Sequence, residues 1–575
     1  MIAHLSELVT LRAEDNTVVL VSPYHPELLP LFRGLPDRRY DPTNRCWSMP
    51  LTTHHITAAL RTFPDALLSD SFRQAMVQEA SVKEEIEQPA PQPDDIALPL
   101  YPYQCQDVAW LRKRDNAILA SDPGSGKTPE GIAWASLHLP CLVVCPPSVK
   151  LNSQAEILKS RPQDTVEILS GYRPYALSGA NWTIITYNLL RGHMNAGAWS
   201  IWQDALQDKF TSLIGDEAHL IRNFRTAAMS KAFVKIAVQT PRCLVITGTP
   251  IVNSPVDLFP LLVCVKHRSH TYPAYVSFLQ QYTHTVTHSY YKTGGKQRQV
   301  LKPGRPRNLA ALKEETSQYL LRRRKAEILK DLPPKRFKNI TLTLDPTHQS
   351  IYRKTHETML RGWAQERKDP SPLHKRRVAH LGQLQRLRHL TAMGKIPTLE
   401  ELLEQNVVEQ RKAVIFSCFL APLDSVYNRF QSHSLLMTGA LNPEEKFAAV
   451  RQFQEDESKL FALCSTTAMG LGITLTAADL VYFLDLPWTP LEKLQAEDRL
   501  HRISQKNAVE IVHLLAKGTI DEHMLMVLER KASTAEGVMG EGSSQWAVLR
   551  ELEQILAADH PAAKEALAIE IHEDF

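Results

Sequence analysis

The chain has 575 residues, which at the usual size of globular domains corresponds to roughly three to four domains. Hydrophobic residues make up 43% of it and charged residues 22%, a composition that excludes the disordered and fibrous classes. The formal net charge of +4 is small for this length, so overall charge neither requires nor excludes nucleic acid as a partner. The 8 cysteines include no C-x-x-C pair, no signal peptide opens the chain, and no stretch of about 18 apolar residues occurs. We therefore expect reduced cysteines, no zinc site and no contact with a membrane.

Residues 1–80 predict a small N-terminal domain, with a strand over 16–22, a helix over 26–33 and a turn at 41–44 between two further strands. Basic and aromatic side chains gather around that turn, at Arg38, Arg39, Tyr40, Arg45 and Trp47. Such a mixture contacts phosphates and stacks on exposed bases, although the core of a hairpin is the alternative role of the two aromatic rings. The pattern R-x-Y-D-P-x-x-x-x-W over 38–47 resembles the HARP domain. That resemblance implies a DNA-binding α+β domain whose contacts come from Arg38, Arg39, Tyr40 and Trp47.

An acidic, proline-rich stretch over 81–98 predicts a semi-extended linker. Beyond it, short apolar runs alternate with helix-like segments in two regions, the pattern of parallel sheets covered by helices on both faces. The runs are 117–120, 141–145, 183–186, 212–215 and 243–247 in the first region, and 413–417, 435–438, 460–465, 480–484 and 509–514 in the second. The predicted divisions are a first α/β lobe over 99–265, a basic and mostly helical insertion over 266–400 with a Gly/Lys-rich loop at 292–307, a second α/β lobe over 401–532, and a helical tail over 533–575.

Residues 119–128, L-A-S-D-P-G-S-G-K-T, form a glycine-rich turn between an apolar run and a helix-like stretch. Gly124 and Gly126 allow the backbone to bend so that N–H groups and a helix N-terminus face a polyphosphate. Lys127 would reach the β- and γ-phosphates, and the Thr128 hydroxyl would hold Mg²⁺. Because Ser121 replaces the first glycine of G-x-x-x-x-G-K-[ST], a glycine-rich surface turn is the alternative.

Two further groups of charged residues suit phosphoryl transfer. The run 212–219, S-L-I-G-D-E-A-H, is an apolar strand that ends in two adjacent carboxylates. Asp216 would hold Mg²⁺ through water and Glu217 would take a proton from the attacking water, the alternative being a solvated acidic pair. Arg499 and Arg502 are three residues apart, and we expect them on one face of a helix. There they would stabilise charge on the transferring phosphoryl group, unless they are simply exposed arginines of an amphipathic helix.

The motifs follow one another in an order typical of one family. They are Y-Q (103–104), D-P-G-S-G-K-T (122–128), V-V-C-P-P-S (143–148), I-T-Y-N (185–188), D-E-A-H (216–219), I-T-G-T-P-I-V-N (246–253), L-R-R-R-K-A-E-I-L-K-D-L-P-P-K (321–335), A-V-I-F-S-C-F (413–419), T-A-M-G-L-G-I-T-L (467–475), F-L-D-L-P-W-T-P (483–490) and Q-A-E-D-R-L-H-R-I-S-Q (495–505). Over residues 100–530 this set resembles a complete helicase superfamily two core of the SWI/SNF type, and with the N-terminal match it is most similar to HARP-containing annealing helicases and their compact bacterial or phage relatives. The resemblance implies two RecA-like lobes that use ATP and Mg²⁺.

The resemblance also implies a role for individual residues. ATP binding would involve Gln104, Asp122, Gly124, Ser125, Gly126, Lys127, Thr128, Gly472 and Gln495. The catalytic residues would be Lys127, Asp216, Glu217, Arg499 and Arg502, with Thr128 and Asp216 at the metal. Coupling between sites would pass through His219, Thr247 and Thr249, and DNA backbone contacts would come from Ser148, Tyr187, Thr249, Thr438, Thr467 and Gly470. Such sequence-independent contacts suit a motor that moves along any sequence.

Three departures from the family pattern remove no catalytic group. Residues 121–126 replace the usual D-E-M-G-L-G, Lys446 replaces a frequent arginine, and Thr489 replaces the asparagine of W-N-P. We therefore expect activity with altered rates. The basic run at 375–377 is interpreted as a solvated helix face rather than a nuclear signal.

The function that the resemblance implies is an ATP-dependent translocase on duplex, forked or branched DNA, for branch migration, reannealing or protein displacement in repair, replication or recombination. A strand-separating helicase and a nucleic-acid-binding module with little motor activity are the alternatives. We expect a monomer, with replication or repair proteins as candidate partners. Its expected location is the cytoplasm, at the nucleoid, in a bacterium or phage, and the nucleus in a eukaryote.

Overall fold

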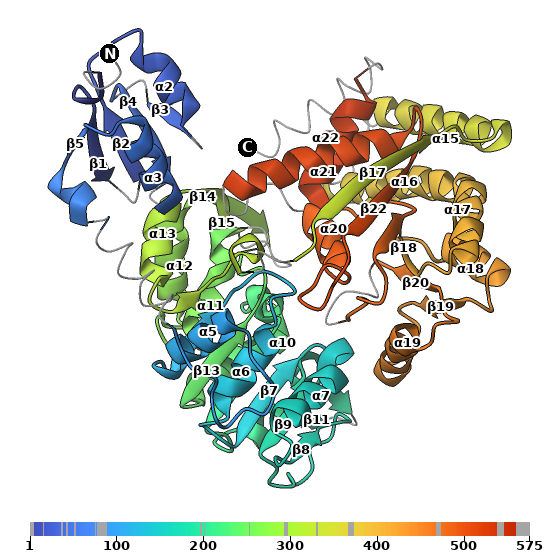
Figure 1. Ribbon diagram of the computed structural model, residues 1–575, viewed down its shortest axis with the longest axis horizontal. Helices are drawn as coiled ribbons and strands as arrows, with labels where there is room; N and C mark the ends of the chain where they lie inside the picture. The colour runs from blue at the N-terminus through green and yellow to red at the C-terminus, as the bar shows by residue number, and fades with distance from the viewer. Residues whose placement is uncertain are drawn as a thin grey trace. The chain divides into compact units, whose positions relative to one another are not determined.

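The computed structural model describes residues 5–14, 17–35, 38–41, 44–50, 53–74, 76, 89–191, 193–195, 198–200, 202–251, 254–291, 297–328, 332–365, 373–466, 473–537 and 545–558. The chain forms two compact units (Figure 1). Unit 1 comprises Met1–Ser121, Lys127–Val144 and Glu156–Arg323, and unit 2 comprises Asp122–Gly126, Cys145–Ala155 and Arg324–Phe575. Within the described ranges, no helix is long and apolar enough to span a membrane.

Unit 1 begins with a small mixed sheet in the order β3-β4-β2-β1-β5. Its elements are β1 (Thr10–Glu14), β2 (Thr17–Val21), α2 (Leu28–Gly34), β3 (Arg39–Asp41), β4 (Cys46–Pro50), α3 (Thr53–Thr62) and β5 (Leu67–Leu68). Strands β1 to β4 pair antiparallel, while β5 joins β1 in parallel. Phe32, Phe63 and Phe72 are buried in the core of this domain. The predicted α+β fold is confirmed, whereas the likeness to a HARP domain stays a prediction.

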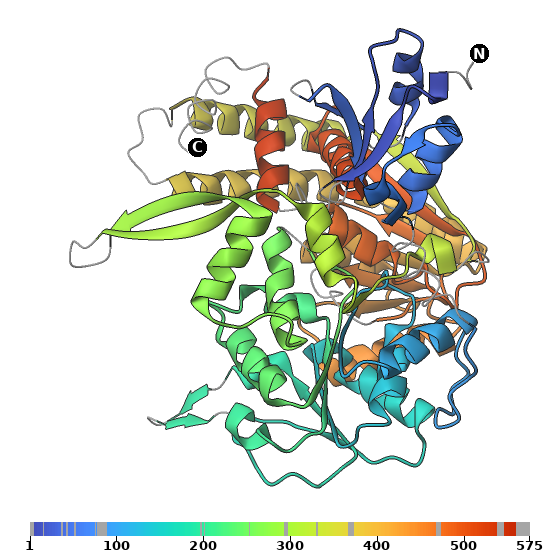
Figure 2. The same cartoon turned by 90° about the vertical axis from the view of Figure 1, so that its left-hand side faces the viewer.

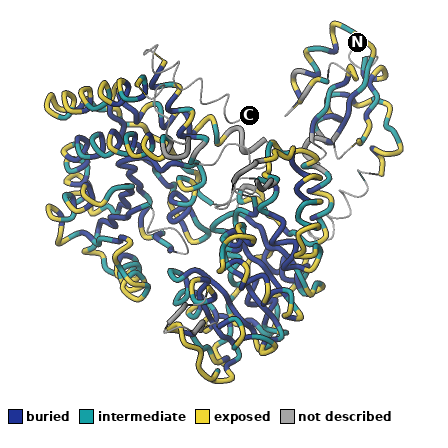
Figure 3. Tube along the Cα trace, turned by 180° about the vertical axis from the view of Figure 1, so that it is seen from behind, coloured by how far each residue is buried: buried dark blue, intermediate teal, exposed yellow. Residues whose placement is uncertain are grey.

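The main sheet of unit 1 has 7 strands in the order β16-β6-β13-β12-β7-β9-β8. They are β6 (Asn116–Leu119), β7 (Cys141–Cys145), β8 (Val166–Ile168), β9 (Trp182–Thr186), β12 (Ser212–Asp216), β13 (Arg242–Ile246) and β16 (Leu320–Leu321). The central strands β6, β13, β12 and β7 pair in parallel and are almost entirely buried, because their residues are apolar on both faces (Figure 3). Their carboxyl ends therefore meet at one edge of the sheet, the edge where α/β proteins bind ligands.

Helices and short elements connect these strands. They are α5 (Pro102–Arg112), α6 (Lys127–Ala135), η1 (Pro147–Val149), α7 (Lys150–Ser160), α8 (Tyr187–Leu190), β10 (His193–Asn195), β11 (Ala198–Ser200), α9 (Trp202–Leu206), η2 (Ala218–Asn223), α10 (Ala228–Gln239), η3 (Pro255–Leu258), α11 (Phe259–Cys264), α12 (Tyr272–Tyr282) and α13 (Leu309–Thr316).

A two-stranded antiparallel hairpin of β14 (Thr283–Tyr291) and β15 (Gln297–Pro306) lies between α12 and α13. The predicted loop over 292–307 is therefore wrong for 297–306, while 292–296 lie outside the described residues. The reason is that the threonines and Val286 of β14 favour an extended chain and offer a partner strand to Val300 and Leu301.

Unit 2 is built on a 6-stranded sheet in the order β17-β22-β21-β18-β20-β19. Its strands are β17 (Lys335–Leu342), β18 (Ala413–Ser417), β19 (Ser434–Met437), β20 (Phe461–Ser465), β21 (Leu480–Phe483) and β22 (Val509–Ala516), and all neighbours pair in parallel. Its helices are α14 (Lys325–Ile328), α15 (Pro346–Gln365), α16 (Leu373–Gly394), α17 (Ile396–Val408), α18 (Leu420–Arg429), α19 (Pro443–Glu455), α20 (Pro490–Glu497), α21 (Ile520–Gly537) and α22 (Gln545–Leu556).

The tail helix α22 belongs to the core of unit 2. Val548, Leu549 and Leu552 are fully buried in the same cluster as Trp363 of α15 and Leu528 of α21. The buried His380 of α16 also binds Glu553, with 2.7 Å between Nδ1 and Oε1. The described part of the tail therefore contributes to the stability of the second sheet.

The two parallel sheets confirm the predicted fold class of two α/β lobes with helical insertions. Every predicted apolar run forms a strand whose ends lie within two residues of the predicted ones. Strands β8, β16 and β17 were not predicted. The domain boundaries inferred from the sequence stay predictions.

Candidate functional site

The glycine-rich turn joins β6 to α6. Gly124 and Gly126 have φ of 82° and 78°, in the left-handed region that favours glycine. The Nζ of Lys127, the first residue of α6, donates to the carbonyl oxygen of Ser121 at 2.8 Å. The turn thus ends at a helix N-terminus, an arrangement that suits an anion such as a polyphosphate. An ammonium that now binds a backbone carbonyl would exchange that partner for phosphate oxygens.

The two acidic residues lie where β12 ends, within unit 1. Asp216 accepts a hydrogen bond from the Glu217 N–H at 2.9 Å through Oδ1. Burial, and next the charge of Glu217, raise the pKa of Asp216 to about 7. Glu217 has φ 51° and ψ 46°, a left-handed conformation that is rare outside glycine and is typical of functional sites. A hydroxyl and a carboxylate, from Thr128 and Asp216, form a donor set that suits Mg²⁺.

A chain of polar contacts leads from Glu217 to the next strand. His219 Nδ1 lies 3.3 Å from Glu217 Oε2 and 3.2 Å from Thr247 Oγ1. The same Thr247 oxygen accepts the Thr249 N–H at 3.1 Å. The structure therefore brings together, across the ends of β12 and β13, the acidic residue and the three residues predicted to couple the sites.

Gln104 lies at the N-terminus of α5 and is only 3% exposed. Its Oε1 accepts the Tyr101 N–H at 2.9 Å, which closes the N-terminus of the helix. Tyr101 is 46% exposed, and its ring stacks on that of Tyr103 with centroids 6.1 Å apart. An exposed aromatic surface therefore adjoins the glutamine that was predicted to take part in ATP binding.

Two buried acids, and the arginine that pairs with one of them, were not predicted as site residues. Arg323 Nη2 lies 2.7 Å from Asp107 Oδ1, and Asp107 is fully buried. Glu130, on α6, is also fully buried, and burial raises its pKa well above the ordinary value although Lys127 and Arg323 act in the opposite direction. The spacing of Glu130 three residues after Lys127 was the only signal, because burial of an acid cannot be read from one sequence.

Within unit 2, the turn residues 122–126 contact the segment that carries the two predicted arginines. A Cβ added to Gly124 would lie 3.1 Å from Arg502 Cγ and 3.3 Å from Lys325 Nζ. The Lys325 N–H also donates to Asp122 Oδ2 at 2.9 Å. Only a residue without a side chain fits this close approach.

The prediction that Arg499 and Arg502 share one face of a helix is wrong. Helix α20 ends at Glu497, and both arginines lie in the turns that follow. Asp498 is the C-cap residue of this helix, and its carboxylate is held by Lys325 and Lys335, at 2.9 and 3.0 Å. Arg499 is 5% exposed, and the Leu475 N–H donates to its carbonyl oxygen at 2.9 Å.

Arg502 is held by two groups of unit 2. Its Nε donates to the Asp498 carbonyl oxygen at 2.9 Å and its Nη1 to Thr474 Oγ1 at 2.7 Å. Burial opposes the charge of Asp498, but the charges of Lys335 and Lys325 outweigh it and keep the pKa of this carboxyl below its ordinary value. Lys335 also binds Glu497 at 2.9 Å, so the two acids beside the arginine turns are neutralised. Gln495, on α20, is half-buried.

The residues predicted to contact DNA have different surroundings. Ser148 is half-buried in η1, Thr249 is half-buried after β13, and Thr438 is 7% exposed after β19. Tyr187 is 1% exposed and its ring packs against Phe233 with centroids 5.4 Å apart, so this ring forms core rather than surface. The predictions for Thr467, Gly470 and Gly472 lie outside the described residues.

In the N-terminal domain the two aromatic residues have different roles. Tyr40 is 51% exposed, while Trp47 stacks on Phe32 with centroids 5.8 Å apart and belongs to the core. Their rings lie 5.1 Å apart. Arg38 is exposed and donates to the Leu35 carbonyl oxygen at 3.0 Å, whereas the side chain of Arg39 lies outside the description.

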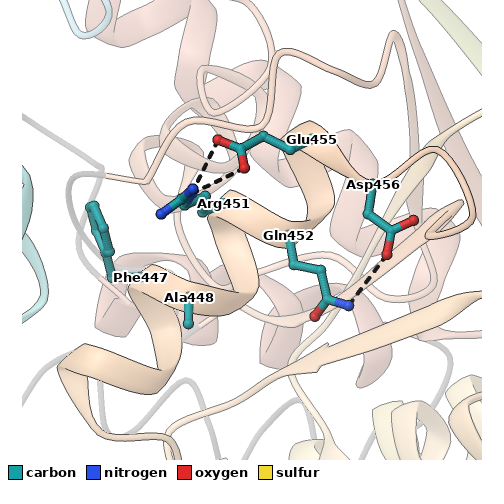
Figure 4. A pocket seen from close by; sticks show the side chains of 6 residues that line it. All are labelled: Phe447, Ala448, Arg451, Gln452, Glu455 and Asp456. Atoms are coloured by element: carbon teal, nitrogen blue, oxygen red, sulfur yellow. Dashed lines mark hydrogen bonds and ion pairs between the residues drawn. The ribbon is translucent and has the colours of Figure 1, made fainter.

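A surface hollow along α19 is separate from these residues (Figure 4). Its lining consists of Phe447, Ala448, Arg451, Gln452, Glu455 and Asp456. Arg451 binds Glu455 at 3.0 Å, and Gln452 binds Asp456 at 3.4 Å, so the polar groups of the hollow are paired with one another. No predicted site residue lines it.

The comparison with protein families decides the identity of the chain. A model of the SNF2-related domain matches residues 103–391, and a model of the helicase conserved C-terminal domain matches residues 394–504. The chain belongs to the SNF2-related family. The enzyme class predicted from the sequence, that of DNA-dependent, nucleotide-binding ATPases and helicases, is confirmed at this level.

Curated relatives come from animals and bacteria. The chain is 28% identical over 454 residues to the DNA annealing helicase and endonuclease ZRANB3 of Mus musculus, covering 76% of this chain and 41% of that protein. It is 28% identical to an uncharacterized ATP-dependent helicase of Mycoplasma pneumoniae, covering 75% and 41%. It is 27% identical to the SWI/SNF-related matrix-associated actin-dependent regulator of chromatin subfamily A-like protein 1 of Xenopus tropicalis, covering 88% and 53%. The chain thus spans about half the length of these relatives.

Among solved structures, the SWI2/SNF2 ATPase core of Sulfolobus solfataricus in complex with dsDNA is similar. It is 24% identical, with a TM-score of 0.36 and coverage of 81% of this chain and 98% of that one.

Proposed function

We propose that this protein is an ATP-dependent DNA translocase of the SWI/SNF type that acts on duplex or branched DNA. The observation that carries the proposal is the polar chain from Glu217 through His219 and Thr247 to Thr249, which lies at the carboxyl edge of a parallel sheet, where α/β proteins bind ligands. Such a chain links a group that acts on water to the Thr249 segment, which is predicted to contact DNA.

The residues of unit 1 fit a nucleotide with Mg²⁺. Lys127 and the N–H groups at the start of α6 would hold phosphate oxygens, and Thr128 with Asp216 would hold the metal. ATP with its metal would supply the phosphoryl group whose transfer to water releases the energy for movement. Glu217, at the end of β12, would take the proton of the attacking water through its carboxylate.

Arg499 and Arg502 would supply the positive charge that phosphoryl transfer requires. Arg499 and Arg502 lie in the turns after α20, and Arg502 contacts the glycine-rich turn through the space left by Gly124. The lysines around Asp498 hold this segment in place.

Branch migration and strand reannealing are the reactions we favour for the motor. Support comes from the names of the relatives, which include a DNA annealing helicase, and from the exposed Tyr40 beside the basic residues of the N-terminal domain. An exposed ring beside basic groups suits unpaired bases next to a phosphate backbone, as at a fork. A role in DNA repair, and partners among repair or replication proteins, follow from the same analogy.

ATP hydrolysis by the wild type and by Glu217→Gln tests the proposal. Rates are measured without DNA and with single-stranded, duplex and forked DNA at one fixed salt concentration, because binding to phosphates depends strongly on salt. We expect stimulation by duplex or forked DNA that disappears in the variant. Equal rates with and without DNA would overturn the translocase and favour a binding module. Efficient separation of a duplex with a single-stranded overhang would favour a strand-separating helicase instead.

A further inference from the structure

The β14–β15 hairpin of unit 1 is a two-stranded ribbon of nine and ten residues that extends away from α12 (Figure 2). We refer to residues 283–291 and 297–307 as the basic hairpin. Among the described strands it pairs with no third one, and the side chains of His284, Val286, Lys302 and Arg305 are exposed, whereas Thr283 at its base is buried. An isolated ribbon is marginally stable in water, because it has no layer to pack against.

The charge of this region has one sign. Between Asp257 and Glu314 the sequence contains no acidic residue. The basic residues of the two described strands and of the position that follows them are His284, His288, Arg298, Lys302, Arg305 and Arg307. A surface of one sign over a whole element creates a field that attracts the opposite charge.

Glu315, the second acid beyond the hairpin, is already neutralised at its base. Glu315 binds Arg268 at 2.6 Å and His267 at 2.9 Å, and it accepts a short hydrogen bond from the Tyr282 hydroxyl. Burial raises the pKa of Glu315, but the hydrogen bonds from Arg268, Tyr282 and His267 outweigh it and keep that pKa below the ordinary value. Glu315 therefore does not neutralise the charge of the strands.

The base of the hairpin is fixed by hydrogen bonds. Thr283 Oγ1 donates to the Leu279 carbonyl oxygen at 2.7 Å, and the Arg307 N–H donates to the Tyr282 carbonyl oxygen at 2.9 Å. The Arg307 side chain binds the carbonyl oxygens of Gln280 and Gln281. Arg307 is thus a structural residue, while Lys302 and Arg305 have no ion pair with any described residue.

We propose that the basic hairpin binds the phosphate backbone of duplex DNA, as a contact of the translocase additional to its motifs. This proposal rests on the proposed function. The composition favours nucleic acid over an acidic protein, because the strands combine Lys and Arg with Thr, Ser and Gln, the side chains that contact phosphates. A protein interface would instead need a buried core of large apolar or aromatic residues.

The test compares three forms of the full chain: wild type, Lys302→Glu/Arg305→Glu, and the control Lys159→Glu/Lys209→Glu. The control makes the same change of charge at two exposed lysines that precede strands of the main sheet, on the side opposite the candidate site. Equilibrium binding of duplex DNA is measured over a series of salt concentrations, together with ATP hydrolysis with and without DNA.

We expect the hairpin variant to bind duplex DNA about tenfold more weakly. The slope of log affinity against log salt concentration should become shallower by about two, because each phosphate contact contributes about 0.9 to it. Its hydrolysis without DNA should equal that of the wild type, and the control should bind like the wild type. Affinity and salt slope equal to those of the wild type in the hairpin variant would overturn the proposal for the hairpin. The proposed function would still stand in that case, provided that DNA stimulates hydrolysis by the wild type. An absence of any stimulation in the wild type would instead overturn the proposed function.

Discussion

Lys325 Nζ lies 2.9 Å from the carboxylate oxygen Oδ1 of Asp498 in unit 2. Through its backbone N–H, the same lysine binds Asp122 of the glycine-rich turn. One residue of the L-R-R-R-K motif therefore holds both the turn and the segment that carries Arg502. This suggests a positioning role that the motif order alone does not reveal.

Substitution of Lys325 tests its role in positioning the Arg502 segment separately from any role in folding. In Lys325→Met, Asp498 keeps its ion pair with Lys335 at 3.0 Å, so we expect unit 2 to fold. We also expect a shift of the Asp498 backbone carbonyl, which accepts a hydrogen bond from Arg502. We expect DNA-stimulated ATP hydrolysis to fall about 10- to 100-fold, because small displacements of catalytic groups have effects of this size. Lys325→Arg should recover part of the rate, and Lys517→Met, at an exposed lysine, should leave it unchanged. Normal turnover by Lys325→Met would contradict the positioning role.

Gly124 permits a test with a well-matched control. Gly124 and Gly179 have nearly the same φ, 82° and 80°, but a Cβ would meet Arg502 and Lys325 at Gly124 and nothing within 4 Å at Gly179. Gly→Ala should cost about 1 to 2 kcal/mol of backbone strain at either position. Only Gly124→Ala should also lose ATP binding, measured by titration with a fluorescent nucleotide. Equal nucleotide affinity in the two variants would show that the close approach at the turn has no role in binding.

Acid should destabilise unit 2 through His513. This histidine is 2% exposed, its Nδ1 lies 2.8 Å from Asn339 Oδ1, and burial, with the charge of Lys493 next, lowers its pKa to about 3. Below the unfolded pKa of about 6.5 the unfolded chain takes up a proton that the folded unit does not, so the free energy of unfolding falls as pH decreases from about 6.5 toward 3, by up to about 1.4 kcal/mol per pH unit.

Urea unfolding at pH 7.5 and pH 5.0 measures this effect. His513→Gln cannot titrate and can still donate to Asn339, so its unfolding free energy should fall less between the two pH values than that of the wild type. His270→Gln, at an exposed histidine, should behave like the wild type. The same loss in the His513→Gln protein and in the wild type would refute the assignment.

Removal of one partner from the buried pair of Lys395 and Asp521 should destabilise unit 2. Lys395 is fully buried, and its Nζ lies 2.5 Å from Asp521 Oδ2. Lys395→Met leaves a buried carboxylate without its counter-charge, so we expect a loss of about 3 to 5 kcal/mol in unfolding free energy. Arg429→Met breaks an ion pair whose arginine is exposed, and it should change stability very little. A small loss in Lys395→Met would show that the hydrogen bonds of Thr391 and Ala516 to Asp521 are sufficient.

The strands of both parallel sheets could be predicted because they are continuous apolar runs, as in C-L-V-V-C of β7. Strand β17 was missed because it lies at the edge of its sheet and exposes Arg336, Phe337 and Lys338, which breaks that pattern. An edge position depends on which strands become neighbours, and a single sequence does not give that information.

The candidate site likewise contains residues that the sequence predicted and residues that it did not. The site residues of unit 1, among them Lys127, Glu217 and Thr249, were predicted because each belongs to a short motif. The turn conformation at Arg499 was not, because the segment that follows α20 is held by contacts with Lys325 and Lys335, which are far away in the sequence. The buried acids Asp107 and Glu130 were missed because a charged residue gives no sign in the sequence that it is inside.

The pairing of β17 with β22 has a consequence for how the chain is made. Residues 335–342 align with residues 509–516 along the whole length of β17. On the ribosome, the first of these strands must therefore remain without its neighbour until residue 516 has emerged, with its backbone groups open to other chains. The region matched by the helicase C-terminal model, 394–504, contains neither strand. We therefore expect a fragment with those bounds to aggregate and not to fold as an independent domain.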